Sequence, residues 1–206
     1  MREDLSSVFT NIFNTNRWKS LETKSGPGSE IIQTENIRKY LPKIISDFNI
    51  DTILDAPCGD FNWMKKLQIW KYVKQYTGYD IVEKIIEQNS ALFTRDNVHF
   101  ECKNIVCDEL EKADLIICRE CLVHLQIQDI IDSLNNFKRS GSKYLLLTNY
   151  SNITVNKETY DGHWRALNFE IEPFNFPTPL CTISEEYTKD GSFPGKNICL
   201  WKISDL

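Results

Sequence analysis

The stretch from Asp51 to Trp63 constrains this chain most, because it combines a strand, a sharp turn and a helix start. It reads Asp-Thr-Ile-Leu-Asp-Ala-Pro-Cys-Gly-Asp-Phe-Asn-Trp, which predicts a buried strand over 52–55, a tight loop around Gly59 and a helix capped by Asn62. An acidic residue at a strand's carboxyl end, followed by a glycine turn, is how open α/β sheets form a nucleoside pocket. Asp80 ends the next predicted strand in the same way, so two carboxylates are expected at one edge of the sheet.

Strands and helices alternate along the rest of the chain, which predicts a mostly parallel sheet with right-handed crossovers and helices on both faces. The predicted strands cover 76–80, 98–105, 113–118 and 144–150, and the predicted helices cover 81–93 and 127–138. The last two strands, 182–187 and 197–203, are separated by a loop rich in Gly and Pro, which predicts an antiparallel hairpin. Residues 151–180, which precede these two strands, form an irregular aromatic segment. Segments of that length are usually functional loops.

Residues 1–49 are expected to form a helical segment and a loop that precede the main unit, 50–206, within one compact domain. Apolar spacing predicts one helix over 5–13 and another over 30–48, with Ser29 or Thr34 as its cap. The sequence Ser25-Gly-Pro-Gly-Ser29 between them cannot continue a helix. Two interpretations stay open for this loop, a surface linker or a cover over the pocket. Trp18 favours the cover, because a linker rarely contains a tryptophan.

Composition excludes several classes of partner. The net charge of −5 and the sequence pI near 5.3 argue against binding to nucleic-acid phosphates. The chain has no run of about 18 apolar residues, so no membrane span is expected.

Its first residues lack a secretory signal, and seven cysteines, an odd number, suggest free thiols in a reducing compartment, so a cytoplasmic location is expected. Cys118 and Cys121 have redox-motif spacing, but a small buried thiol is the commoner interpretation; without a second such pair no metal site is expected.

Several motifs in order make residues 50–203 resemble the class I S-adenosylmethionine-dependent methyltransferase family. They are Asp55-Ala-Pro-Cys-Gly-Asp-Phe61, Asp80 after the second strand, Asn104-Ile105, and Cys118-Arg-Glu-Cys-Leu-Val-His-Leu125 after the fourth. The resemblance implies a Rossmann-like fold and S-adenosyl-L-methionine as cofactor. The residues expected to bind it are Trp18, Gly26, Ser29, Asp55, Ala56, Pro57, Cys58, Gly59, Asp80, Ile81, Asn104, Ile105 and Arg119.

Physical chemistry supports specific roles for three of these residues. The Asp80 carboxylate is suited to accept from both ribose hydroxyls, and Gly59 lets the backbone approach the methionyl part of the cofactor. Asp55 is expected to order the loop amides or to hold the cofactor's ammonium through water. The alternative for either acid is a solvated strand end or a helix cap.

The loop departs from the family at Pro57 and Phe61, where glycines are common. A dinucleotide pyrophosphate is bound by free backbone amides that it must approach closely. Proline has no amide hydrogen to donate, and the phenylalanine side chain is expected to obstruct the approach of the pyrophosphate to the loop. This argues against an NAD-dependent oxidoreductase and is better tolerated by S-adenosylmethionine, which has no phosphate. The same departure motivates an alternative function, a non-catalytic methyltransferase-like binding subunit.

The methyl acceptor is expected to meet the loop after the fourth strand. His124 is the candidate general base because its ordinary pKa lies near neutrality, and the alternative is a histidine packed on a helix's first turn. Further acceptor candidates are Asp60, Tyr150, His163 and Arg165. The pair His163 and Arg165 suits a polar or anionic acceptor such as a sugar or phosphate derivative. The alternative is a loop that is simply anchored by Trp164.

The Asn-Pro-Pro-Tyr signature of nucleic-acid amino-methylating enzymes is absent after the fourth strand. Trp18 and the Gly/Pro loop are similar to a subgroup of small bacterial methyltransferases associated with polysaccharide or capsule modification. The sequence therefore predicts O-methylation of a small polar metabolite or a carbohydrate or capsule precursor. It leaves open whether the chain is a monomer or a homodimer.

Overall fold

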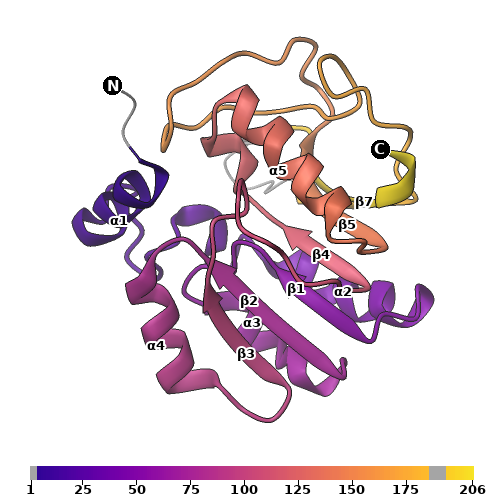
Figure 1. The fold of residues 1–206 in the computed structure, drawn as a ribbon. Helices are drawn as coiled ribbons and strands as arrows, with labels where there is room; N and C mark the ends of the chain where they lie inside the picture. The colour runs from indigo at the N-terminus through magenta and orange to yellow at the C-terminus, as the bar shows by residue number, and fades with distance from the viewer. Residues whose placement is uncertain (1–3, 186–193) are drawn as a thin grey trace.

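In a computed structural model, which describes residues 4–185 and 194–206, the chain forms a seven-stranded sheet in the order β3-β2-β1-β4-β5-β7-β6 (Figure 1). The strands β1 to β5 pair in parallel, and β7 pairs antiparallel with both β5 and β6. The predicted fold class, a mostly parallel sheet with a C-terminal antiparallel pair, is therefore confirmed. The strands are β1 (Thr52–Asp55), β2 (Gln75–Asp80), β3 (Val98–Cys102), β4 (Leu115–Cys118), β5 (Tyr144–Tyr150), β6 (Cys181–Ser184) and β7 (Lys196–Lys202).

Helices cover both faces of this sheet, because its central strands alternate their apolar side chains between two cores. Leu54 and Ile116 belong to the core that contains Phe137 of α5, whereas Ile53 and Leu115 belong to the other. That second core is completed by residues of α2 and α3. The helices are α1 (Leu5–Thr15), α2 (Glu35–Asp47), α3 (Asn62–Leu67), α4 (Glu83–Phe93) and α5 (Ile127–Arg139), and the short 3₁₀ turns are η1 (Pro27–Ser29), η2 (Ile69–Lys71), η3 (Leu122–His124) and η4 (Ile203–Asp205).

Some predicted boundaries are wrong. The strand expected over 98–105 ends at Cys102, and the strand expected over 113–118 begins at Leu115. The helix expected from residue 30 begins at Glu35; Thr34 donates to backbone carbonyls of the preceding turn instead of capping the helix. The helix expected from residue 81 begins at Glu83. Most of the predicted hairpin loop, 189–195, and the end of the strand predicted over 182–187 fall within 186–193, outside the described residues.

Asn62 does not cap α3 as the sequence predicts. The cap position is taken by Phe61 in a left-handed conformation, φ 58°. The Asn62 side chain instead donates to the Glu22 carboxylate and the Ser29 carbonyl. A residue expected to order its own helix therefore joins that helix to the N-terminal segment.

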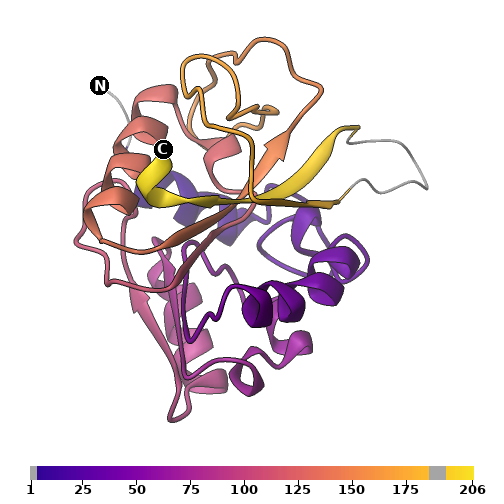
Figure 2. The same cartoon turned by 90° about the vertical axis from the view of Figure 1, so that its right-hand side faces the viewer.

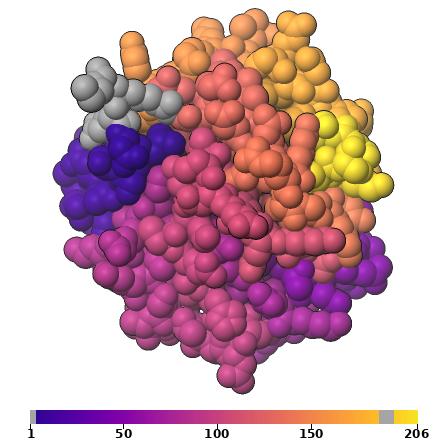
Figure 3. All heavy atoms as spheres, in the orientation of Figure 1, coloured from indigo at the N-terminus to yellow at the C-terminus, as the bar shows by residue number. Residues whose placement is uncertain are grey.

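The N-terminal helix α1 lies beside the start of α4, near the carboxyl ends of the strands (Figure 1). Phe13 packs with Val82 and Ile85, and the Ser6 hydroxyl donates to the Ile81 carbonyl. In the space-filling view of Figure 3, the described N-terminal residues (indigo) lie directly against the residues that follow β2 (magenta). This contact positions α1 over the edge where the predicted site residues end.

The long segment after β5 loops beyond the carboxyl end of that strand (orange in Figure 2). Its second half is anchored in the core through Leu167, Phe169 and Phe176. Its middle is bonded to the loop after β4, because Gly162 N donates to the His124 carbonyl and Arg165 N donates to the Val123 carbonyl. This segment therefore braces the loop that carries His124.

Two features are absent from the described residues, a membrane-spanning helix and a metal-binding cluster. Over 4–185 and 194–206, none of the helices combines the length and the apolar character that crossing a bilayer requires. Within the same ranges, no cluster of three or more His, Cys, Asp and Glu side chains has an arrangement that would hold a metal ion.

Candidate active site

A pocket opens at the carboxyl ends of β1, β2 and β4, and it contains about 1000 Å³ of space, open solvent at its mouth included. Its apolar wall comes from α1 and from the turns after β2 and β3: Leu5, Phe9, Ile12, Phe13, Ile81, Val82, Ile85, Ile105, Val106. The other lining residues are Trp18, Lys24, Ser25, Ser29, Asp55, Pro57, Cys58, Gly59, Trp63, Asp80, Lys103, Asn104, Arg119, Glu120, Cys121, His124, Leu125. The edge predicted from Asp55 and Asp80 is thus a real cavity.

Asp55 ends β1 and is buried at this pocket. Its Oδ2 accepts a hydrogen bond of 2.6 Å from the Tyr76 hydroxyl. Burial raises the pKa of Asp55 to about 7, while the Tyr76 bond and the Arg119 charge act in the opposite direction. Asp55 is therefore held by a neighbouring strand, and the loop amides are ordered by another residue.

That residue is Asp80, at the end of β2. Its Oδ2 accepts from Gly59 N at 3.1 Å, and its Oδ1 accepts from Val82 N at 2.9 Å. Burial raises the pKa of Asp80 to about 6, although these amide bonds lower it. Each carboxylate oxygen keeps lone-pair capacity for a second donor, so the side chain can both order the loop and accept from a ligand.

The loop after β1 follows the surface of the pocket at Pro57, Cys58 and Gly59. Gly59 has φ 54°, and a side chain there would collide with the Ser25 hydroxyl. The obstruction expected of Phe61 is wrong, because its ring is buried in the core against Tyr76, Phe93 and Phe100. Ala56 is likewise fully buried, behind the loop.

Asn104 and Ile105 reach the pocket from the turn after β3. The Asn104 Oδ1 accepts from Val106 N at 3.0 Å, and its backbone N–H donates to Asp108 at 2.8 Å. The side chain therefore shapes this turn while it lines the cavity. Ile81, in the turn after β2, lines the same pocket, so two turns contribute apolar side chains to it.

The N-terminal segment reaches the same pocket through Trp18 and Ser29. The Trp18 indole stacks on the His124 imidazole. Gly26, φ 86°, lies behind the indole, because a Cβ at that position would be 3.1 Å from Trp18 Cε3. A side chain on Gly26 would push this ring from its place.

Arg119 joins this segment to the body of the protein. Its Nε donates to buried Glu185 at 2.9 Å, and its Nη1 donates to the Gly28 carbonyl at 2.8 Å. A longer contact of 3.4 Å joins Nη2 to the Gln33 carbonyl. The guanidinium lines the pocket, but its donors are committed to the protein.

His124 lies in η3, half-buried under Trp18. Its Nδ1 is 3.1 Å from the His163 carbonyl. Because a carbonyl only accepts hydrogen bonds, Nδ1 carries the proton and Nε2 keeps its lone pair. Burial lowers the pKa of His124 to about 4, against the charge of Glu120, so the ring is neutral at pH 7.

The structure does not bring the predicted acceptor residues onto the pocket wall. The Asp60 carboxylate accepts from Thr23, Lys24 and Ser25. Tyr150 is buried behind Glu120 and donates to it at 3.2 Å.

The side chains of His163 and Arg165 form hydrogen bonds to other segments of the protein. The exposed His163 ring pairs with Arg17 Nη2 at 3.0 Å. Arg165 donates to the carbonyls of Leu122 and Lys157.

Sequence reasoning missed the apolar residues of α1 and the acid Glu120. The spacing of apolar residues in α1 predicts that one face of the helix is buried, but it does not predict which surface that face covers. Glu120 follows Arg119 in a polar loop, a pattern typical of a solvated ion pair. Nothing in the sequence distinguishes it from the other acids of the chain, because its buried partners are distant in sequence.

No family model matches the sequence, and no curated protein matches it. Among solved structures, magnesium protoporphyrin IX methyltransferase (ChlM) from Synechocystis PCC 6803 with bound SAH is similar, with a TM-score of 0.63, 14% identity, and coverage of 97% of this chain and 99% of that one. N-methyltransferase NodS from Bradyrhizobium japonicum WM9 has a TM-score of 0.62 and 14% identity, over 83% of this chain and 96% of that one. A putative S-adenosylmethionine dependent methyltransferase from Listeria monocytogenes has a TM-score of 0.57 and 16% identity, over 83% and 97%. The chain therefore has the class I methyltransferase fold, as its motifs predicted.

Proposed function

We propose that this protein is an S-adenosylmethionine-dependent methyltransferase that methylates an oxygen of a small polar metabolite or carbohydrate precursor. The observation that carries the proposal is the Asp80 carboxylate, fixed against Gly59 N and facing a pocket with an apolar wall. The likeness to solved methyltransferases, one of them with SAH bound, adds support.

The residues present fit such a cofactor. Asp80 would accept from the ribose hydroxyls, because its oxygens retain acceptor capacity beside the two amides. Ile81 and Ile105 would flank the adenine, with Asn104 at its edge. The backbone from Pro57 to Gly59 would follow the methionyl part, and Asp55 would lie near its ammonium.

The N-terminal segment would cover the bound cofactor. Trp18 and Ser29 line the pocket directly, and Gly26 supports the indole from behind. Arg119 contributes by holding Gly28 rather than by donating to the ligand. The bonds from Asp60 and Asn62 to this segment argue for an ordered cover and against a free linker.

When bound, the cofactor supplies a methyl group on an activated sulfonium, and transfer to an oxygen leaves a thioether and one proton to remove. The lone pair of His124 Nε2 would take this proton. The low pKa makes His124 a weak base at neutral pH, and the adjacent Glu120 charge favours its protonated form. Trp18, stacked on the ring, limits the approach of water to that face.

The alternative, a non-catalytic binding subunit, was motivated by Pro57 and Phe61. Since Phe61 turns into the core, only Pro57 still distinguishes the loop, and the pocket beside it is open. We therefore favour the enzyme. Tight cofactor binding with no turnover and a stable complex with another protein would favour the alternative.

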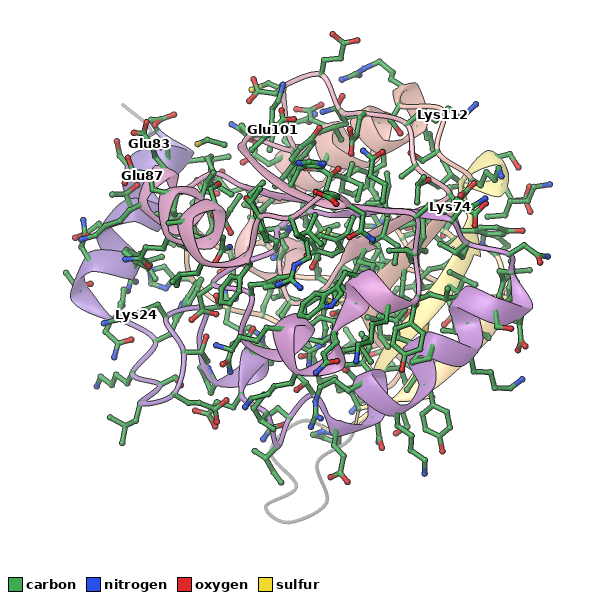
Figure 4. The ribbon with its side chains drawn as sticks, turned by 90° about the horizontal axis from the view of Figure 1, so that it is seen from below. Lys24, Lys74, Glu83, Glu87, Glu101 and Lys112 are labelled. Atoms are coloured by element: carbon green, nitrogen blue, oxygen red, sulfur yellow. The ribbon has the colours of Figure 1, made fainter. Side chains whose placement is uncertain are left out.

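Calorimetry with S-adenosylhomocysteine tests the proposal. We expect binding by the wild type and at least tenfold weaker binding by Asp80→Asn. The matched control is Asp51→Asn, whose carboxylate pairs with Lys74. Lys74 lies on the opposite side of the molecule from Lys24 and Glu83, which mark the pocket end (Figure 4). No binding by the wild type would overturn the cofactor assignment, and unchanged binding by Asp80→Asn would overturn the ribose role.

The general-base role has its own test. His124→Gln is expected to lose most of kcat while its affinity for S-adenosylhomocysteine is kept. An unchanged kcat would reduce His124 to a packing residue.

A further inference from the structure

Glu120 is held in an unusual conformation at the floor of the pocket. It follows β4 with φ 53°, in the left-handed region that residues with a side chain rarely adopt. Its backbone N–H donates to Thr148 Oγ1 at 2.9 Å, which holds this conformation. The chain thus accepts backbone strain here, and the strained backbone directs a carboxylate toward the cavity.

One oxygen of this carboxylate is bound by the protein. Oε1 accepts from the Tyr150 hydroxyl at 3.2 Å and lies 3.5 Å from the Lys196 ammonium, which is itself almost fully buried. Burial alone raises the pKa of Glu120, but the charges of Lys196 and Arg119 outweigh it and hold the pKa below its ordinary value. The side chain is therefore an anion at neutral pH.

Among the residues that the structure describes, the other oxygen has no donor. Within 4–185 and 194–206, Oε2 accepts no hydrogen bond from protein; it lies beside Gly28, where a Cβ would be 3.2 Å away. A carboxylate oxygen at the wall of a cavity requires a donor from solvent or ligand, because leaving it unpaired is costly. Oε2 is thus an acceptor at the pocket that no described residue satisfies.

The neighbouring cations do not create an anion site. Arg119 is committed to Glu185 and to the carbonyls of Gly28 and Gln33. The Lys196 ammonium lies 3.5 Å from a carboxylate oxygen of Glu120 and 3.7 Å from one of Glu185. An incoming phosphate or carboxylate would meet the negative charge of Glu120 before it met a cation with a free donor.

We propose that Glu120 binds a hydrogen-bond-donating group, a hydroxyl or an ammonium, on the methyl acceptor, and that this end of the pocket rejects carboxylate and phosphate groups. The proposal rests on the proposed function and narrows its acceptor class. It departs from the anionic acceptor that the sequence suggested at His163 and Arg165, because both side chains are used in bracing loops.

Two small probes of similar size test the charge preference, methylammonium and acetate, each titrated into protein saturated with S-adenosylhomocysteine. NMR at the Trp indole resonances reports binding, since Trp18 lies on the same pocket. We expect methylammonium to bind at least tenfold more tightly than acetate. Acetate that binds equally or better would overturn the proposal, and so would no binding of methylammonium. Failure of S-adenosylhomocysteine to bind would instead overturn the proposed function.

Two variants test whether Glu120 is the residue that binds methylammonium. Glu120→Gln is expected to weaken methylammonium binding about tenfold, as expected for loss of a charge-assisted hydrogen bond, and to leave S-adenosylhomocysteine affinity within about threefold. The matched control is Glu101→Gln, an exposed acid on β3 (Figure 4). Gly28→Ala, which crowds Oε2 and keeps the charge network, should also lose methylammonium binding. Methylammonium binding that survives in both variants would overturn the role of Glu120.

Discussion

The indole of Trp18 stacks on the imidazole of His124, with ring centroids 4.7 Å apart and ring planes inclined by 28°. One ring belongs to the N-terminal segment and the other to the loop after β4. A second aromatic contact, with Phe9 at 6.3 Å, ties the indole to α1. The pocket is thereby bridged from its N-terminal wall to the candidate base.

Removing this bridge should loosen the pocket. We expect Trp18→Ala to weaken S-adenosylhomocysteine binding about tenfold, because it removes the indole from the pocket wall and with it the apolar area that the ligand would bury there. Calorimetry measures the change. Leu21→Ala is the matched control, since Leu21 belongs to the same segment and is fully exposed. Equal affinities for the two variants would contradict a role for the indole in covering the ligand.

Asp60 should control the order of the N-terminal loop. Its carboxylate accepts from Thr23 Oγ1 at 2.7 Å, Lys24 N at 2.9 Å and Ser25 Oγ at 3.1 Å. We expect Asp60→Ala to increase amide hydrogen exchange over 19–29 at least tenfold without unfolding the sheet. Asp47→Ala, which removes an exposed pair with Lys43, is the control. If Asp60 instead binds the acceptor, as the sequence suggested, exchange will stay unchanged and KM will rise.

The sheet was predictable because its strands are apolar runs punctuated by Gly, Pro and acids, and the acids at the strand ends marked the pocket. Side chains whose partners are distant in sequence were not predictable. Asn62 suits a helix cap but bonds the N-terminal segment, and Asp60 and Arg165 suit a ligand but bond loops. From the sequence, Phe61 is expected to obstruct the loop, but its left-handed backbone directs the ring into the core. In each case tertiary contacts overrode a local preference.

Cofactor affinity should fall in mild acid. Burial raises the pKa of Asp55 to about 7 and of Asp80 to about 6, so the free protein gains protons as the pH falls from 8 to 5. Accepting from the ribose hydroxyls as well as from two backbone amides uses both oxygens of an ionised carboxylate, so binding must expel a proton from Asp80 below pH 6. We expect affinity for S-adenosylhomocysteine to fall about tenfold per pH unit there, measured by calorimetry. Asp80→Asn should bind weakly with a shallower pH dependence; an identical slope would assign the proton elsewhere.

His124 should make stability depend on pH in the same range. Burial lowers its pKa from 6.5 to about 4, so between these values the unfolded chain binds a proton that the folded protein does not. This contribution is present above pH 6.5 and is lost as the pH falls toward 4. Relative to His124→Gln, the wild type should therefore lose about 2–3 kcal/mol of unfolding free energy between pH 7.5 and 4.5.

Urea denaturation at the two pH values measures this difference, and the buried aspartates cancel because both proteins contain them. Parallel changes in the wild type and His124→Gln would show that the imidazole titrates normally in the folded protein.

The bonds of Arg119 also set the order in which this pocket is completed. Its carbonyl partners at Gly28 and Gln33 are synthesised before it, whereas Glu185 follows much later, beyond β6. Until then the guanidinium lacks its hydrogen-bonded carboxylate, and burying it is costly. We therefore expect the contacts of Arg119 to stay incomplete on the ribosome until β6 and Glu185 have emerged, after every loop that lines the pocket.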